Sequence, residues 1–420
     1  MKSKFSLLLL GLIAASCPAR AQDKSFHLKD GDCVVFYGDS ITDQRLYTTF
    51  TETFVLTRFP KLNVRFVHSG WGGDRVSGGG GGNIDLRLQR DVFAYKPSVM
   101  TIMLGMNDGS YRAFDQEIFE RYARGYERIV ESVKRARPGI RLTLIQPSPF
   151  DDVTRAPNFE GGYNKVLVRY GQFVKELAAR EGLHGADLNT AVVSALEKAK
   201  AADAETAKKI INDRVHPGPA GQLLMAAELL KAWNAPTLVA SIEIDAAAGR
   251  VVANQTKVSN LHTNGKLSWT QSDHALPLAI DLSDPVMALA VSSSDFVTAL
   301  NQQPLKVSGL SSANYELRID DAAVGTFTRE QLAEGVNLAA LSTPMSRQAS
   351  EVHKLTLQHN NLHFARWRQV EVPLAVYKSE RIQKAVQDLM AALDVEEEEI
   401  VKQQRATAQP KEHRFELSPR

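Results

Sequence analysis

The sequence predicts an α/β protein in which a parallel sheet with helices on both faces is followed by a β-rich and then a mainly helical C-terminal region. Short apolar runs alternate with helical periodicity between residues 33 and 233, a pattern typical of parallel sheets covered by helices. After Pro236 the chain changes to short segments of alternating polarity, as in half-buried strands. With 44% hydrophobic and 23% charged residues, the composition is that of a globular protein.

The first residues are predicted to be a secretory signal peptide. Lys2 and Lys4 precede an apolar run over 5–16, and Ala19-Arg20-Ala21 provides a small-x-small cleavage site. The run is too short to span a membrane. We therefore expect residues 1–21 to be removed on export to the periplasm or the cell exterior, and we expect no stable membrane span elsewhere.

Apolar runs and helical periodicity place the elements of the first domain, which we assign to residues 22–235. Continuous apolar runs are typical of buried parallel strands, and they occur at 33–37, 63–67, 98–104, 140–145 and 184–188. Apolar residues spaced three and four apart predict a helix over 115–137 that ends at Pro138-Gly139. Further helices are expected over 161–181 and 219–233, and a flexible loop over the polyglycine stretch 78–82.

Two further regions are expected after this domain. Residues 236–327 form the β-rich region, with strands predicted over 239–244, 249–253, 276–282, 286–291 and 315–319. Residues 328–420 form the mainly helical region, which is interrupted near Pro344 and contains a long helix over 381–404.

The first candidate for chemistry is Gly38-Asp39-Ser40, directly after the first strand. Open α/β folds bind ligands at the carboxyl edge of the sheet, and a helix N-terminus there favours negative charge. A serine at that position is suited to act as a nucleophile. Serine is also one of the best helix N-caps, so this motif alone leaves both interpretations open.

The second candidate is the run from Asp213 to His216, just before the last helix of the domain. Across a tight turn the Asp213 carboxylate can reach the imidazole and stabilise its protonated form, as the acid of a catalytic triad does. A histidine is also the general base that a serine nucleophile needs near neutral pH. Alone, the motif is more typical of an ordinary turn.

Two glycine-containing turns follow the second and third strands. Gly105-Met106-Asn107-Asp108 offers an amide that can donate to an oxyanion. The segment from Ser69 to Asp74 contains Gly70, Gly72 and Gly73, where a backbone N–H can approach a ligand closely. Each is an ordinary turn when taken singly, but all four motifs lie at one edge of one α/β unit.

Together these four blocks resemble the SGNH, or GDSL-type, hydrolase superfamily, over about residues 34–233. The resemblance implies a flavodoxin-like three-layer α/β/α fold, esterase, lipase or carbohydrate-deacetylase activity, and no metal or organic cofactor. It implies that Ser40 is the nucleophile, His216 the base and Asp213 the orienting acid. It further implies an oxyanion hole made of the Ser40 and Gly73 N–H groups and the Asn107 side chain.

Several assignments around the site have alternatives. Asp39, Trp71 and Asp108 are candidates for substrate binding, and Trp71 is equally well explained as a packed aromatic. Gly70 is a rival for Gly73, and Asp187 is a rival for Asp213. We interpret His68 as a structural residue.

Arg75 is expected either to meet an anionic substrate or to pair with Asp74 or Asp85.

The charge and cysteine content exclude other function classes. A net charge of +2 and no recognisable motif argue against nucleic-acid binding. Two cysteines, Cys17 and Cys33, are too few for a disulfide scaffold or a cysteine-ligated zinc site.

We expect an exported serine ester hydrolase that acts on a small ester or an acylated carbohydrate, with acetyl groups preferred. The alternatives are a short-chain esterase or lysophospholipase, and a non-catalytic glycan-binding protein on a hydrolase scaffold.

Overall fold

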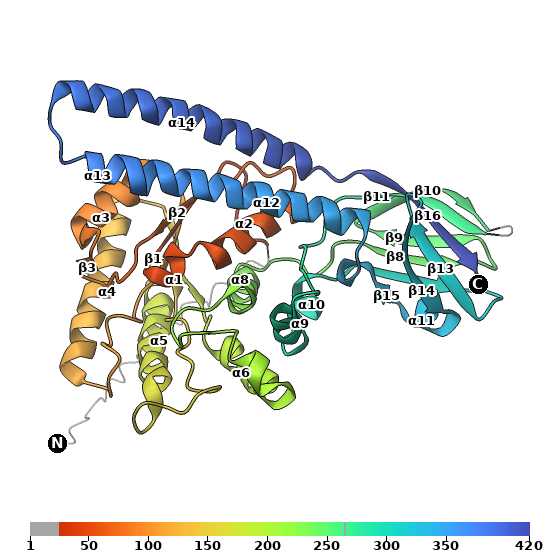
Figure 1. Cartoon of the computed structure of the whole chain (residues 1–420), viewed down its shortest axis with the longest axis horizontal. Coiled ribbons are helices and arrows are strands. Elements are labelled where there is room, and N and C mark those ends of the chain that lie inside the picture. The colour runs from red at the N-terminus through yellow and green to blue at the C-terminus, as the bar shows by residue number, and fades with distance from the viewer. Residues whose placement is uncertain (1–24, 264–265) are drawn as a thin grey trace, which may run out of the picture.

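The computed structural model describes residues 25–263 and 266–420. The expected signal peptide, residues 1–21, lies outside the described residues. Figure 1 shows the α/β domain at one end of the molecule, two β-sheets at the other, and a pair of long helices that runs along one side. Among the described residues no helix is long and apolar enough to cross a membrane.

A parallel sheet forms the centre of the α/β domain, as predicted. Its strand order is β2-β1-β5-β6-β7, the order of flavodoxin-like folds. These strands are β1 Cys33–Gly38, β2 Arg65–Gly70, β5 Val99–Met103, β6 Arg141–Ile145 and β7 His184–Ala186. Every residue of β5 is buried, as its continuous apolar sequence requires.

Helices cover both faces of this sheet. Phe36 of β1 packs against Tyr47 of α2 and Trp233 at the end of α8, whereas the neighbouring Tyr37 lies under Arg87 of α3. Successive strand residues point to opposite faces, so α2 and α8 cover one face and α3 lies on the other with α4 and α5. The helices are α1 Ser40–Asp43, α2 Leu46–Arg58, α3 Ile84–Asp91, α4 Gln116–Ala136, α5 Gly162–Glu181, α6 Thr190–Ala202, α7 Ala204–Ala207 and α8 Pro219–Ala232.

The polyglycine stretch is ordered rather than a flexible loop. β3 Gly78–Gly79 pairs antiparallel with β4 Gly82–Asn83, and the turn between them lies against the ring of Trp71. A Cβ on Gly81 would come within 2.5 Å of that ring. Glycine is needed here because the backbone packs directly on an aromatic face.

The region after α8 contains two sheets that share one hydrophobic core. Ile242 of β8, Leu305 of β12, Trp269 of β11 and Phe415 of β16 all belong to it. The sheets have the orders β15-β12-β8-β9 and β10-β11-β16-β13-β14. The strands are β8 Ser241–Asp245, β9 Arg250–Asn254, β10 Thr256–His262, β11 Leu267–Asp273, β12 Pro304–Ser308, β13 Asn314–Ile319, β14 Ala322–Thr328, β15 Val336–Asn337 and β16 Glu412–Pro419.

Two predicted strands of this region are wrong. Residues 286–291 belong to helix α9, Pro285–Ser292, which begins with Pro285 after the N-cap Asp284. Residues 276–282 form neither a strand nor a helix in the described chain. Both segments pack on the α/β domain, and α10 Phe296–Leu300 follows them there. Contact with α8 decided the conformation of α9, since short apolar runs suit either element.

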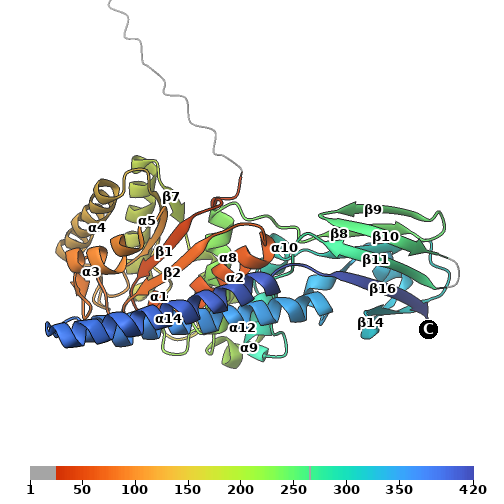
Figure 2. The same cartoon turned by 90° about the horizontal axis from the view of Figure 1, so that it is seen from above.

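The chain returns to the α/β domain through a helical hairpin, which we define as residues 344–407. It comprises α12 Pro344–Phe364, a π-helix η3 Ala365–Glu371, α13 Val372–Leu374 and α14 Glu380–Thr407, and Figure 2 shows its two long helices running together beside α2 and β2. Pro344 opens α12 after the N-cap Thr343, so the predicted interruption is a helix start. α11 Arg329–Glu334 precedes it.

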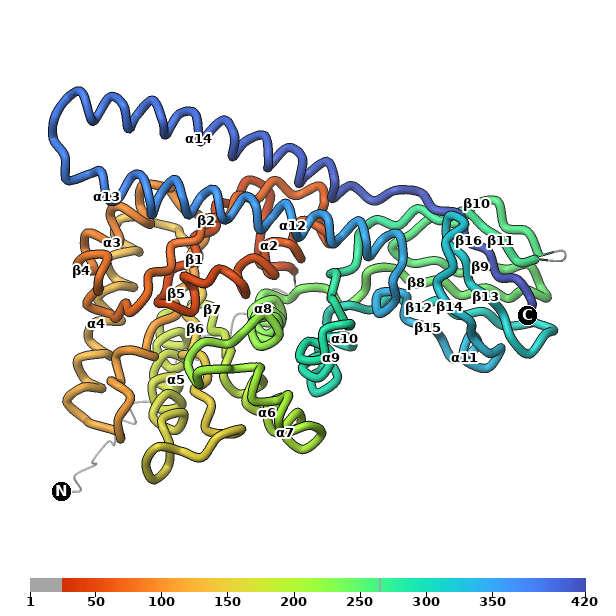
Figure 3. Tube along the Cα trace, viewed as in Figure 1, coloured from red at the N-terminus to blue at the C-terminus, as the bar shows by residue number. Residues whose placement is uncertain are grey.

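The final strand joins the hairpin to the β-rich region. β16 lies between β11 and β13 and pairs antiparallel with both, as the tube in Figure 3 allows the reader to follow. Residues 236–327 and 328–420 therefore share one sheet. The two sheets packed on this shared core are called the sandwich below. The hairpin is connected to the sandwich at both of its ends.

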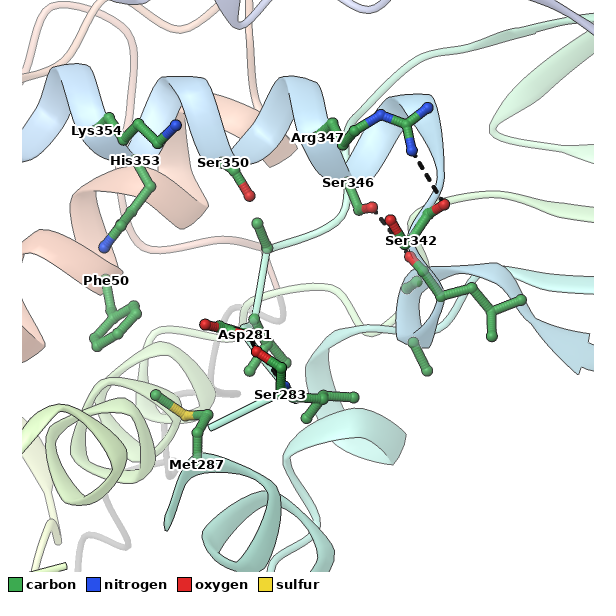
Figure 4. Close-up of a pocket in the computed structure, with 16 residues that line it drawn as sticks. Phe50, Asp281, Ser283, Met287, Ser342, Ser346, Arg347, Ser350, His353 and Lys354 are labelled. Carbon is green, nitrogen blue, oxygen red and sulfur yellow. Dashed lines mark hydrogen bonds between the residues drawn. The ribbon is translucent and has the colours of Figure 1, made fainter. Parts of the chain in front are cut away.

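The α/β domain, the β-rich region and α12 meet around a cavity of about 710 Å³ (Figure 4). Phe50 of α2 and Met287 of α9 line it together with His353 of α12. The His353 ring stacks on Phe50 with the centroids 4.9 Å apart, and its Nδ1 hydrogen bonds with Thr53 Oγ1 at 2.9 Å. Burial lowers the pKa of His353 to about 4, so this joint between the regions is held by a neutral imidazole.

A buried charged cluster attaches the hairpin to the α/β domain. His359 of α12 lies between Glu52 of α2 and Glu397 of α14, with N–O distances of 3.6 and 3.2 Å. Although burial opposes it, hydrogen bonding to both carboxylates raises the pKa of His359 to about 10. Burial likewise opposes ionisation of both glutamates, but hydrogen bonds, from His359 first, hold the pKa of each well below its usual range.

We predict that this cluster makes stability depend on pH. The His359 pKa is above its ordinary 6.5, so its contribution is complete below pH 6.5 and is lost as the pH rises toward 10. The glutamates, with pKa values below their ordinary 4.5, contribute above pH 4.5 and lose that contribution in acid. His359→Gln should lower the free energy of unfolding at pH 6 by about 3 kcal/mol, because both carboxylates lose a buried partner.

The measurement is thermal unfolding from pH 5 to 9 for the wild type, His359→Gln and His262→Gln. His262 is an exposed histidine of β10 and serves as the matched control. The wild-type and His262→Gln curves should fall together above pH 6.5, whereas the His359→Gln curve should be flatter. A His359→Gln curve parallel to that of the wild type would contradict the role given to His359.

Candidate active site

Ser40 is the first residue of α1, immediately after β1. Gly38 lies beneath the turn, where a Cβ would come within 2.2 Å of Thr42 Oγ1 and 2.7 Å of the Met103 carbonyl oxygen. The Asp39 carboxylate caps the helix by accepting a hydrogen bond from the Ile41 N–H at 3.0 Å. Ser40 N–H has no acceptor within the described residues, so it remains available at the helix N-terminus.

His216 and Asp213 complete a hydrogen-bonded chain with this serine. His216 Nε2 lies 2.8 Å from Ser40 Oγ, and His216 Nδ1 lies 2.6 Å from Asp213 Oδ2. The other Asp213 oxygen accepts the Val215 and His216 N–H groups at 3.0 and 2.8 Å. Burial alone would raise the pKa of Asp213, but hydrogen bonds from His216 and Val215 lower it. An ionised Asp213 is suited to orient the imidazole and stabilise its protonated form.

Gln222 of α8 connects the segment that carries Ser40 with the segment that carries His216. Its Nε2 donates to the Pro217 carbonyl oxygen at 3.1 Å and to Gln44 Oε1 at 2.5 Å, and its Oε1 accepts the Tyr47 N–H at 2.9 Å. It therefore joins the residue after His216 to the segment after Ser40. Sequence reasoning missed this fully buried residue, because a glutamine inside an apolar helix carries no motif that marks its partners.

The predicted oxyanion donors Gly73 and Asn107 lie in the turns that follow β2 and β5, the two strands that flank β1. Gly73 has a φ of +77°, in the left-handed region that favours glycine, and its N–H has no acceptor in the described part of the chain. The Asn107 amide donates to the Asp74 carbonyl oxygen at 3.0 Å, and its oxygen accepts from the Tyr111 hydroxyl at 3.0 Å. Asn107 is thus oriented beside the Gly73-Asp74 peptide, with its second amide hydrogen available.

Asp39 and Asp108, the candidates for substrate binding, are both buried in the structure. Asp39 is 2% exposed and serves as the cap of α1, and Asp108 is 8% exposed and accepts the Val76 N–H at 3.0 Å. Burial raises the pKa of each carboxyl to about 7. Their hydrogen bonds to the Ile41 and Val76 N–H groups support the interpretation that they stabilise the Ser40 and Asn107 turns.

Trp71 is packed within the protein, whereas Arg75 lies at the surface. Trp71 is only 9% exposed, and the Arg368 guanidinium lies 3.0 Å from its ring centroid, which favours the interpretation as a packed aromatic. Arg75 is exposed, and neither expected ion pair forms, because Asp74 pairs with Arg87 and Asp85 with Arg128.

The rival assignments have structural explanations. A Cβ on Gly70 would collide with the backbone of α1 at 2.2 Å, so this glycine permits close packing. Asp187 caps α6 by accepting the Asn189 and Thr190 N–H groups. His68 is buried between Thr48 and Glu52 and is neutral, since burial lowers its pKa to about 4.

No set of three His, Cys, Asp or Glu side chains in the described residues is arranged to hold a metal ion. The chemical groups that the site presents are an imidazole hydrogen-bonded to a hydroxyl, an ionised carboxylate behind it, and unpaired N–H donors beside it. This combination is suited to nucleophilic attack on a carbonyl with stabilisation of the resulting oxyanion.

Comparisons with known proteins agree with this geometry. Residues 36–224 match the model of the GDSL-like Lipase/Acylhydrolase family. An acetylxylan esterase from Geobacillus stearothermophilus is 25% identical over 219 residues, which cover 48% of this chain and 93% of that protein. The solved structure of a gut microbial diltiazem-metabolizing enzyme matches with a TM-score of 0.79 at 26% identity, and the match covers 94% of this chain and 99% of that one.

The fold, the site and the relatives define this protein as a hydrolase of ester bonds. Its α/β domain is similar to the GDSL-like lipase/acylhydrolase family, the SGNH hydrolases, over residues 36–224. The resemblance inferred from the four sequence blocks is therefore confirmed. The match to the diltiazem-metabolizing enzyme extends beyond this domain over nearly the whole chain, so the sandwich and the hairpin are part of a shared architecture.

We predict that Asp213, and not Asp187, is the acid of the triad. Asp213→Ala should lower kcat on the order of ten-thousand-fold, because the imidazole loses its orienting partner. Asp187→Ala, the matched control, should keep kcat and lose about 1 kcal/mol of stability with the α6 cap. Ester hydrolysis and thermal unfolding of the two variants decide between them, and the reverse pattern would move the acid to Asp187.

Proposed function

We propose that the chain is an exported serine ester hydrolase that removes acetyl groups from carbohydrate. The observation that carries the catalytic part is the continuous hydrogen-bonded chain from Asp213 through His216 to Ser40. The acetyl preference rests on the acetylxylan esterase relative. The open site supports a bulky alcohol, since the side chains of His216 and Asp213 are 33% and 56% exposed.

The proposed reaction is acyl transfer in two steps. Ser40 Oγ attacks the ester carbonyl carbon while His216 Nε2 takes the hydroxyl proton. The carbonyl oxygen becomes an oxyanion and accepts hydrogen bonds from Ser40 N–H, Gly73 N–H and the Asn107 amide. The C–O bond to the alcohol then breaks, and His216 gives its proton to the leaving oxygen.

Hydrolysis of the acyl-enzyme repeats these roles. His216 takes a proton from water, the resulting hydroxide attacks the acyl carbon, and a second oxyanion forms at the same donors. Collapse returns the proton from His216 to Ser40 Oγ and releases the carboxylic acid. The ionised Asp213 stabilises the imidazolium in both steps.

We expect Ser40→Ala to lower kcat on the order of a million-fold, because the nucleophile is lost. The measurement is turnover of p-nitrophenyl acetate, butyrate and octanoate, followed by acetylated xylo-oligosaccharides and diltiazem. Ser77→Ala, which alters an exposed serine after Val76, is the matched control and should keep full activity. Turnover should be strongest on acetate and should depend on Ser40.

Other outcomes would favour the alternatives. Ser40-dependent turnover that is strongest on octanoate would favour a lysophospholipase or a broader esterase. If no ester turned over, a fluorophosphonate probe failed to label Ser40, and the protein bound polysaccharide, the glycan-binding alternative would replace the enzyme.

Export is a separate proposal that rests on the charged, apolar and small-residue segments of residues 1–21. We expect the protein recovered from the periplasm or medium to begin at Gln22, because cleavage should follow Ala21. N-terminal sequencing of that fraction tests this. Recovery of the unprocessed chain in the cytoplasm would contradict it.

A further inference from the structure

The helical hairpin approaches the turn that carries the oxyanion donor Gly73. After α12 the helix widens into the π-helix η3, Ala365–Glu371. Pro373 explains why the helix widens here, because proline cannot donate a hydrogen bond to the preceding turn and its ring clashes with a carbonyl there. Long π-helical segments are rare and frequently mark functional sites. The residues at the centre of this segment are Trp367 and Arg368.

Trp367 connects η3 to a buried ion-pair network under the turn. Its side chain is 1% exposed, and Nε1 donates to Asp91 Oδ1 at 2.7 Å. Asp91 also pairs with Arg87, which donates to Asp74 Oδ2 at 2.8 Å. The Asp74 carbonyl oxygen in turn accepts the Asn107 amide. One hydrogen-bonded path therefore runs from the hairpin to the predicted oxyanion donor Asn107.

Arg368 contacts the other side of the same turn. Its guanidinium lies 3.0 Å from the centroid of the Trp71 ring, and Nη2 lies 3.8 Å from Asp43 Oδ2. That Asp43 oxygen accepts the Gly72 N–H at 3.1 Å. Arg368 thus secures both Trp71 and the acceptor that holds Gly72, the residues just before Gly73.

The position of Gly73 is sensitive to these contacts for two reasons. Two consecutive glycines, such as Gly72 and Gly73, have more backbone freedom than any other residue pair. Without restraint, the Gly73 N–H would therefore point in many directions. A catalytic donor displaced by about 1 Å can cost a hundredfold in rate. In addition, Asp43 is the last residue of the four-residue helix that begins with Ser40, and an uncompensated carboxylate there would oppose a developing oxyanion.

We propose that Arg368 is a positioning residue for ester hydrolysis, which fixes the Trp71–Gly73 turn and compensates the charge of Asp43. The proposal rests on the proposed function, because Gly73 matters only if Ser40 generates an oxyanion. The C-terminal hairpin is then a component of the active site, and the α/β domain does not supply the complete oxyanion geometry by itself.

The first test is steady-state hydrolysis of p-nitrophenyl acetate by the full chain. Arg368→Ala should lower kcat roughly 10- to 100-fold with KM little changed, since a positioning defect acts on the transition state. Arg368→Lys should recover part of kcat, because the charge near Asp43 returns without the flat stacking on Trp71. Added guanidinium ion at millimolar concentration should partly restore Arg368→Ala.

Arg366→Ala is the matched control. Arg366 belongs to the same π-helix but pairs with Asp394 of α14 at 2.5 Å, within the hairpin. This variant should keep kcat. Thermal unfolding of each variant separates a positioning defect from loss of the fold, since Arg368→Ala should unfold cooperatively, as the wild type does.

The second test does not depend on activity. Amide hydrogen exchange in a peptide that covers residues 71–76 should be faster in Arg368→Ala than in the wild type or Arg366→Ala. If the wild type hydrolysed no ester and this exchange still depended on Arg368, the proposed function would fail while the positioning contact stood. If the wild type were active and Arg368→Ala kept full kcat with unchanged exchange, the positioning role would be overturned.

Discussion

The parallel pairing of β1 with both of its neighbours is the constraint on which the active site depends. Gly38 stands opposite Gly70 of β2 and Met103 of β5, so the three strands end at one level. The turns that follow therefore start from one edge of the sheet, and these turns contain Ser40, Gly73 and Asn107. Gly38 and Gly70 leave room for α1 to lie directly on this edge, which brings its N-terminus to the same point.

Buried charges decide how the C-terminal half docks on this domain. Arg87, Asp74 and Asp91 are each fully buried, and each would carry a large desolvation cost if its partners were removed. Trp367 completes the hydrogen bonding of Asp91 from the hairpin. The same logic applies to His359 between two glutamates, one of which, Glu52, also pairs with His68 of β2. The observed placement of the hairpin satisfies both clusters at once.

The path of the chain anchors the hairpin at both of its ends. It leaves the sandwich at Pro344 and returns to it as β16, which is inserted between two strands. One end of the hairpin follows β15 of one sheet, and its other end leads into β16 of the second sheet. The contacts of η3 with the α/β domain therefore depend on how the whole C-terminal region packs on that domain. The catalytic edge is therefore coupled to a region that carries none of the triad residues.

Much of the α/β domain could be predicted, because its signals are local. The runs that became β1, β5 and β6 are continuous and apolar, and α4 repeats its apolar residues at helical spacing. The hydrogen-bonded residues Ser40, His216 and Asp213 could be named because four motifs together resemble one family, whereas each motif alone left other interpretations open. The wrong strand predictions were 276–282 and 286–291. Short apolar runs such as 286–291 fit strand and helix alike, and this segment became α9, which packs on α8.

By itself, the sequence determined the layered α/β fold, the edge at which the chemistry lies and the residue types that perform it. These features follow from the hydrophobic period and the turn residues, which act over only a few positions of the chain. Tertiary structure alone decided that Asp39 and Asp108 are buried supports, that Gln222 joins the Ser40 and His216 segments, and that Arg368 reaches the oxyanion turn. These contacts join residues up to hundreds of positions apart, and only the packed fold selects which buried polar groups meet.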